Sequence, residues 1–115
     1  MSNDQTEDRR RHYRLAYPLT ARPSVRLADG KTYVVLDSSA GGVRIRVDKD
    51  WPMRKDPTVT GSIKLCSGAT VEFRGRALAV ADRIVAVIFE PGAGLSDADI
   101  LAEQRWLKTR FPHRR

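Results

Sequence analysis

Residues 34–47, which read VVLDSSAGGVRIRV, decide how this chain folds. On both sides of a polar centre, apolar side chains recur at every second position, namely at Val34, Leu36, Val43, Ile45 and Val47. A period of two is typical of strands that turn one face toward a hydrophobic core. The stretch therefore predicts two strands that flank residues 38–41, with these apolar side chains pointing inward.

The connection between the two strands is more polar than a turn requires. It contains the carboxylate of Asp37, the hydroxyls of Ser38 and Ser39, and two glycines, Gly41 and Gly42. Turn chemistry alone is satisfied by fewer such residues. The excess indicates a ligand-binding surface at this end of the two strands.

The size and charge of the chain limit its partners. With 115 residues the chain is large enough for one domain with a single core. Its 21 Lys and Arg against 14 Asp and Glu give a net charge of +7, which favours anionic partners. A nucleotide, a nucleic acid and an acidic membrane surface all meet this condition.

The single cysteine, Cys66, excludes an intramolecular disulfide and fits a reducing compartment. No apolar run approaches the length of a membrane span, and residues 2–8 are polar. We therefore expect a cytoplasmic protein without membrane insertion. Residues 1–8 are expected to be disordered and residues 112–115 to form a basic tail.

Further segments alternate in polarity and are expected to be strands, at residues 24–27, 61–66, 71–80 and 84–89. Asp29-Gly30 predicts a two-residue hairpin turn after the first of them, because both residues can adopt positive φ. The alternation slips near Gly75, which predicts a bulge or a sharp bend there. The last segment is apolar on both faces and is expected to be the most buried strand.

One helix is expected near the C-terminus. Ser96 suits the N-cap, and Asp97 and Asp99 lie in the first turn, where carboxylates oppose the helix dipole. Pro112 ends the helix. The face that should dock on the sheet or on a partner chain carries Ile100, Leu107 and Phe111. Short antiparallel strands followed by a helix favour a small barrel or a sandwich.

Two motifs in this chain resemble those of the PilZ domain, the bacterial receptor module for cyclic di-GMP. Asp37, Ser39 and Gly42 have the spacing D-x-S-x-x-G, and Arg10 and Arg14 have the spacing R-x-x-x-R ahead of the first strand. The resemblance covers residues 8–111. It implies a mainly β fold, a six-stranded antiparallel β-barrel with a C-terminal α-helix, over residues 9–111.

By this resemblance, the arginine arm folds across the barrel mouth and holds cyclic di-GMP against the second motif. Guanidinium groups of Arg10 and Arg14 can donate to phosphate and stack on a base. The carboxylate of Asp37 can accept from the N–H donors of a guanine. Ser39 adds a hydroxyl and a backbone donor, and Gly42 lets the ligand lie close to the backbone.

Three more arginines extend the expected site. Arg9 precedes the arm motif, at a position where an arginine is associated in the family with binding of a stacked dimer of cyclic di-GMP. Arg44 and Arg46 lie on the outward face of the next strand, where they either assist the ligand or remain solvated charges. Ligand binding would order the arm and change the surface that an effector protein meets.

Two other classes of function compete with this reading, and catalysis finds no support. His12 and His113 lie near the two ends of the chain, and we expect no catalytic residues, no metal and no cofactor. The first rival is a small basic barrel that binds single-stranded nucleic acid through Tyr13, Tyr17 and Tyr33. The second is a PilZ-like adaptor that acts by protein contact alone.

Overall fold

The computed structural model describes residues 14–49, 51 and 57–111. The expected disorder of residues 1–8, the expected tail at 112–115, and both Arg9 and Arg10 lie outside these residues. The described chain forms the elements β1 (Leu15–Ala16), β2 (Ser24–Leu27), β3 (Thr32–Ser39), β4 (Gly42–Arg46), β5 (Thr58–Lys64), β6 (Thr70–Ala81), β7 (Ile84–Phe89) and α2 (Asp97–Arg110).

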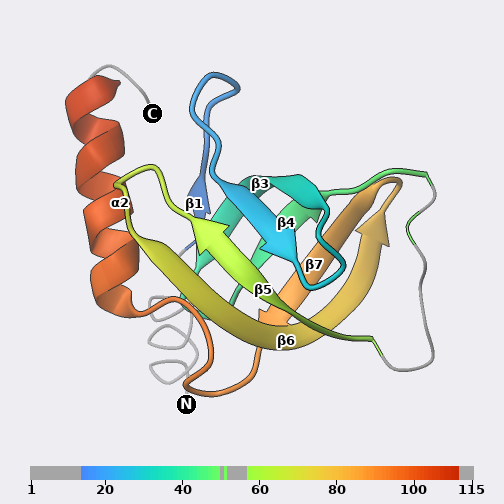
Figure 1. Ribbon diagram of the computed structural model, residues 1–115. Coiled ribbons are helices and arrows are strands. Elements are labelled where there is room, and N and C mark those ends of the chain that lie inside the picture. The colour runs from blue at the N-terminus through green and yellow to red at the C-terminus, as the bar shows by residue number, and fades with distance from the viewer. Residues whose placement is uncertain (1–13, 50, 52–56, 112–115) are drawn as a thin grey trace, which may run out of the picture.

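The strands β2 to β7 close into an antiparallel barrel (Figure 1). Going round the barrel, the order is β3, β2, β5, β6, β7 and β4, and the pairing of β4 with β3 closes the ring. The short β1 pairs with the far end of β3, at Ser38 and Asp37. The predicted six-stranded antiparallel barrel with a C-terminal helix is confirmed.

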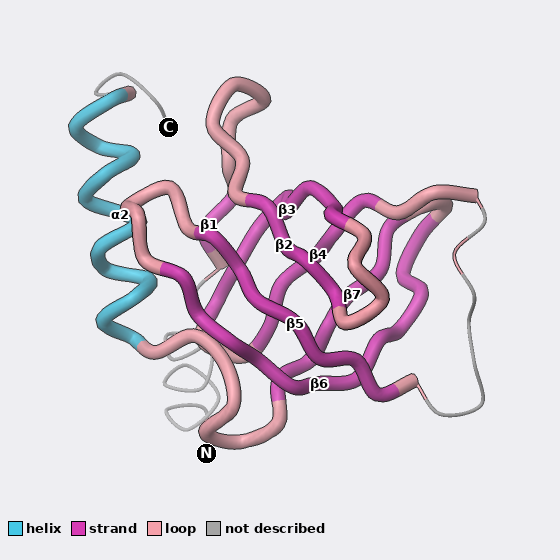
Figure 2. Tube along the Cα trace, viewed as in Figure 1, coloured by secondary structure: helices cyan, strands magenta, loops and turns pink. Residues whose placement is uncertain are grey.

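The core fills the inside of this barrel. Each strand from β2 to β7 contributes side chains at alternate positions, and the most deeply buried aliphatic residues are Val25, Val35, Val43, Ile45, Ile63, Val85 and Val87. Figure 2 shows these strands wrapped around a common centre, with α2 at one side. Burial of aliphatic surface at about 25 cal/mol per Å² is the main force that holds such a small barrel together.

The two strands of the central stretch are confirmed, but the inward face of the first was predicted wrongly. On β3 the inward residues are Tyr33 and Val35, whereas Val34 is 41% exposed. Four apolar residues follow one another from Tyr33 to Leu36, so the period of two fits either face. Pairing decides between them, because Val35 lies opposite the buried Ile45 of β4. On β4 the predicted inward residues are buried as expected.

Strand β3 also extends further than predicted. Ser38 and Ser39, expected in the connection, are part of β3, and the turn to β4 consists of Ala40 and Gly41. A register shift between Val35 and Asp37 marks a β-bulge in the pairing with β4. The bulge and the cover of β1 leave Asp37, Ser38 and Ser39 all buried in succession.

The hairpin between β2 and β3 has a longer turn than predicted. Gly30 adopts positive φ (89°), but Asp29 does not. The N–H of Gly30 donates to the Leu27 carbonyl at 2.9 Å, and the N–H of Leu27 donates to the Lys31 carbonyl at 3.0 Å. These bonds define a three-residue loop that ends in a glycine, the next most common hairpin connection after the two-residue turns.

The structure has no bulge at Gly75 of β6, and the burial expected for both faces of β7 was predicted wrongly. The register of β6 is continuous through Gly75, and the irregularity lies between Ala79 and Ala81. A Cβ on Gly75 would come within 2.4 Å of the Ile88 carbonyl oxygen, so this glycine permits close strand approach without a bulge. Strand β7 is buried on one face only, because Ile88 is 50% exposed.

Helix α2 begins and docks as predicted. The Ser96 hydroxyl accepts from the Asp99 N–H at 3.1 Å, and the Asp99 carboxylate accepts from the Ser96 N–H at 2.9 Å, which completes a capping box. The helix lies beside the turn between β5 and β6 (Figure 1). Its buried residues are Ile100, Glu103 and Leu107, and Phe111 is half-buried against the core. Glu103 was not predicted in this position.

Candidate functional site

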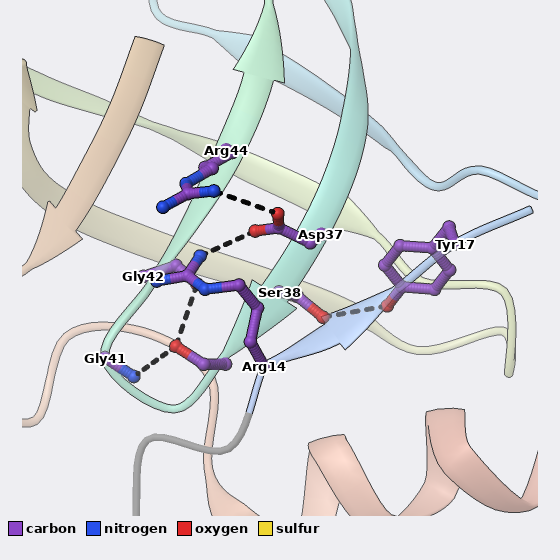
Figure 3. Close-up of polar contacts among 8 residues, drawn as sticks. Arg14, Tyr17, Asp37, Ser38, Gly41, Gly42 and Arg44 are labelled. Atoms are coloured by element: carbon purple, nitrogen blue, oxygen red, sulfur yellow. Dashed lines mark hydrogen bonds and ion pairs between the residues drawn. The ribbon is translucent and has the colours of Figure 1, made fainter. Parts of the chain in front are cut away.

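The carboxylate of Asp37 lies between two arginines (Figure 3). Arg14 Nη1 donates to Asp37 Oδ1 at 2.6 Å, and Arg44 Nη1 lies 3.9 Å from Asp37 Oδ2. The Asp37 side chain is only 13% exposed, whereas those of Arg14 and Arg44 are 45% and 44% exposed. The site therefore presents a nearly buried acceptor with an open guanidinium on each side.

Strand pairing places all three side chains. Asp37 lies opposite Ala16 of β1 on one edge of β3 and opposite Arg44 of β4 on the other. Arg14 directly precedes β1, so the pairing of this short strand brings the guanidinium to Asp37. Both guanidinium groups are half-exposed, so each retains N–H donors that water or another anion can reach while it faces the nearly buried Asp37 carboxylate.

Ser39 is close to this group, but its hydroxyl serves the turn. Ser39 Oγ accepts from the Gly41 N–H at 3.2 Å and donates to the Gly42 carbonyl at 3.4 Å, and the residue is buried. Such local bonds are usual for serine at a turn. A contact between Ser39 and a ligand stays a prediction.

The structure explains why residue 42 is a glycine, for a reason that the sequence did not reveal. A Cβ at this position would lie 2.2 Å from the Val87 carbonyl oxygen of β7. Backbone atoms cannot yield as a flexible side chain can, so β4 and β7 pair here only because residue 42 has no side chain. The glycine is required by the barrel, whatever it does for a ligand.

The structure thus brings together most of the predicted site residues that it describes. Arg14, Asp37, Ser39, Gly42 and Arg44 gather around the turn between β3 and β4. Arg46 faces solvent further along β4, opposite Val34, and makes no ion pair with Asp37. The roles expected of Arg9 and Arg10 remain predictions, since both residues lie outside the described chain.

A buried polar network adjoins the site and was missed in the sequence. The Tyr17 hydroxyl donates to Glu103 Oε1 at 2.8 Å and accepts from Ser38 Oγ at 2.9 Å. Glu103 is fully buried, and its carboxylate also accepts from the backbone N–H of Cys66 at 3.0 Å and of Ser67 at 2.6 Å. The network joins α2 and the β5–β6 turn to β3, next to Asp37.

Burial controls the protonation of the groups around Glu103. Desolvation, with the Glu103 charge as a smaller cause, raises the pKa of Tyr17 far above its ordinary value, so the phenol stays a hydrogen-bond donor. The same causes raise the pKa of the Cys66 thiol to about 11. A signal for Glu103 exists in the sequence, because its spacing from Ile100 and Leu107 puts a carboxylate on the apolar helix face.

This geometry defines a class of protein, a small closed barrel with a cation-flanked acceptor on its outer surface. The model of the PilZ domain matches residues 8–102, which is most of the chain. The chain therefore belongs to the PilZ family, a family of cyclic di-GMP receptors. A search of curated proteins found no match.

The described residues contain no helix that is both long and apolar enough to cross a membrane. In the same part of the chain, no three His, Cys, Asp or Glu side chains gather in a way that could hold a metal ion.

We predict that Glu103→Gln lowers the free energy of unfolding by about 1–3 kcal/mol, because an amide nitrogen must then face a buried N–H or hydroxyl donor. Urea denaturation followed by circular dichroism measures the change. Glu72→Gln, on the exposed face of β6, is the matched control and should change stability little. Equal stability of the two variants would contradict a structural role of the network.

Proposed function

We propose that this protein is a receptor that binds cyclic di-GMP at Asp37, Arg14 and Arg44 and passes the signal to a partner protein. The observation that carries the proposal is the nearly buried Asp37 carboxylate between two half-exposed guanidinium groups. This arrangement suits a ligand that combines guanine N–H donors with phosphate charges.

The binding step exchanges one set of contacts for another. Guanine presents adjacent N–H donors that match the two oxygens of Asp37, and the displaced Arg14 then donates to a phosphate. Each charge-assisted bond contributes about 1.5–3 kcal/mol, so the bonds from guanine to Asp37 and from Arg14 to phosphate together exceed the single Arg14–Asp37 bond that they replace. Membership of the PilZ family supports this choice of ligand.

Arg10 and Arg9 complete the proposed site from the segment ahead of β1. Arg10 supplies a second guanidinium for phosphate or for stacking on a base, as the R-x-x-x-R motif implies. Arg9 favours a stacked dimer of cyclic di-GMP, which presents more negative charge than a single molecule. Ser39 and Gly42 shape the surface on which the ligand lies.

The proposed signal runs from Arg14 to helix α2. Arg14 lies three residues before Tyr17, and the Tyr17 hydroxyl holds the buried Glu103 of α2. When Arg14 moves from Asp37 to the ligand, the segment that contains Tyr17 shifts with it, and the contact with Glu103 changes. A buried charge responds strongly to such a change because its partners are not replaced by water.

The main rival, a barrel that binds single-stranded nucleic acid, is disfavoured by the position of its aromatic residues. Tyr17 and Tyr33 are 5% and 8% exposed, so neither offers a free ring face for a base to stack on. Tyr13 lies outside the described residues. If titration detects no binding of cyclic di-GMP, the protein is instead the PilZ-like adaptor that acts by protein contact alone.

Isothermal titration with cyclic di-GMP tests the site. We expect wild-type binding in the micromolar range or tighter, and at least about tenfold weaker binding for Asp37→Asn and for Arg14→Ala, since the loss of 1.4 kcal/mol is tenfold. Arg26→Ala, an exposed arginine on β2, is the matched control and should bind as the wild type does. Two ligands per chain, reduced to one by Arg9→Ala, would support the stacked dimer.

An absence of heat at tens of micromolar protein, or unchanged affinity of Asp37→Asn, would contradict the proposed receptor. Binding of a single-stranded oligonucleotide with steep salt dependence and without preference for cyclic di-GMP would favour the rival.

Hydrogen–deuterium exchange tests the proposed signal path. We expect cyclic di-GMP to change the exchange of amides in α2 of the wild type, and this change to be lost in Tyr17→Phe, which keeps the ring but not the hydroxyl. Tyr33→Phe is the matched control. If α2 exchanges at the same rate with and without ligand in the wild type, the path through Tyr17 is refuted.

A further inference from the structure

The outer face of β6 and β7 carries exposed apolar side chains that the barrel does not use. Leu78 and Val80 of β6 are 44% and 50% exposed, and Ile88 of β7 is 50% exposed. Three of the six large hydrophobic residues that are exposed in the described chain thus lie on two neighbouring strands. Exposed apolar side chains gathered in one place mark interaction sites more often than scattered ones do.

Strand register brings these side chains into one patch. Leu78 lies opposite Ala86, and Ile88 lies opposite Arg76. Leu78 and Ile88 are therefore diagonal neighbours across two strands, about 7 Å apart at their Cα atoms. Val80 follows Leu78 along β6 at the bulged end of the pairing. The turn between β6 and β7 lies at the end of the barrel far from α2 (Figure 2), and the exposure of the three side chains shows that the helix leaves them uncovered.

Arginines surround this patch. Arg76 of β6 lies opposite Ile88 of β7, and Arg46 of β4 lies opposite Ile84 of β7. Arg83 lies in the turn between β6 and β7. Within residues 14–49, 51 and 57–111, none of these three side chains forms an ion pair. The carboxylates near the rim are those of Asp82 in the same turn, Asp48, which lines a hollow together with Arg46 and Arg83, and Glu90, which pairs with Arg74. The patch is thus apolar in the middle, and arginines outnumber carboxylates at its rim.

We propose that this face, built on Leu78, Val80 and Ile88, docks an acidic amphipathic helix of a partner protein. A second copy of the chain is disfavoured, because a two-fold contact would bring the same arginines of both copies together. Strand β7 is paired on both edges along its length, and β6 is paired on both edges at Gly75 and Arg76, so a partner strand finds no free edge at these positions. A helix with an apolar stripe and flanking Glu or Asp matches both the apolar centre and the charged rim.

The docking face borders the proposed ligand site. Strand β4 separates them, with Gly42 opposite Ile88 and Arg44 opposite Ala86. Arg44 therefore belongs to the rim of the patch and also approaches Asp37. This inference deepens the proposed function, because it names the surface of this protein that would meet the partner and the chemistry of that partner. A role of this surface in regulation rests on the proposed receptor function. Docking itself requires no nucleotide, so the two proposals can fail separately.

Fluorescence anisotropy with a synthetic peptide tests the docking face. The probe is a dye-labelled peptide of about 18 residues, long enough for five helical turns, with Leu on one face and Glu on the other. A peptide of the same composition in scrambled order and a Leu/Lys counterpart are the controls. We expect the purified full chain to bind the Leu/Glu helix, without nucleotide, at least about tenfold more tightly than either control peptide.

Substitutions on the protein locate the contact. Leu78→Asp and Arg76→Glu should each weaken peptide binding at least about tenfold, because each sets a negative charge against the acidic peptide. Leu101→Asp is the matched control, since Leu101 is also 50% exposed but lies on α2. All three variants should melt like the wild type and keep their affinity for cyclic di-GMP, which separates a failure of docking from a failure of the receptor.

Three results would overturn the inference. The first is no binding of the Leu/Glu peptide, or equal binding of the scrambled peptide. The second is that Leu78→Asp and Arg76→Glu both bind the peptide as the wild type does. The third is a dimer of the wild type in sedimentation velocity that Leu78→Asp converts to a monomer, because the face would then belong to a second copy of this chain.

Discussion

The pairing of β3 with a strand on each edge is the constraint on which the site depends. The pairing with β4 closes the barrel and sets Arg44 beside Asp37, and the pairing with the two residues of β1 brings Arg14 to the same carboxylate. The bulge after Val35 shifts the register so that Asp37 lies between these neighbours. Without the bulge, Asp37 would share the inward face of Val35, and Arg14 and Arg44 would have no carboxylate between them.

The same constraint joins the site to the rest of the domain. Ser38, next to Asp37 on β3, bonds to Tyr17, and Tyr17 bonds to the buried Glu103 of α2. A buried carboxylate is tolerated only when every partner is in place, so this network responds to displacement more sharply than an apolar contact would. The network thus gives the proposed ligand site a hydrogen-bonded connection to α2.

Strand period alone predicted a small barrel or a sandwich, and the resemblance of two motifs to the PilZ domain predicted the barrel and the residues of the candidate site. The sequence could not show which face of β3 points inward, because the four consecutive apolar residues from Tyr33 to Leu36 fit either face. The pairing of Val35 with the buried Ile45 decides between the two faces. The sequence could not show that Gly42 is needed against the Val87 carbonyl, a contact between strands far apart in sequence. It also missed Glu103, because a charged residue on a helix is normally assigned to solvent.

Arginine side-chain NMR during titration with cyclic di-GMP tests the central claim most directly, because it observes the two guanidinium groups at Asp37 themselves. The account predicts that the Nε–H signals of Arg14 and Arg44 shift together with the backbone amide of Asp37, while the Nε–H of Arg26 on β2 does not move. Saturable binding that leaves Arg14, Arg44 and Asp37 unchanged, with shifts confined to other strands, would contradict it.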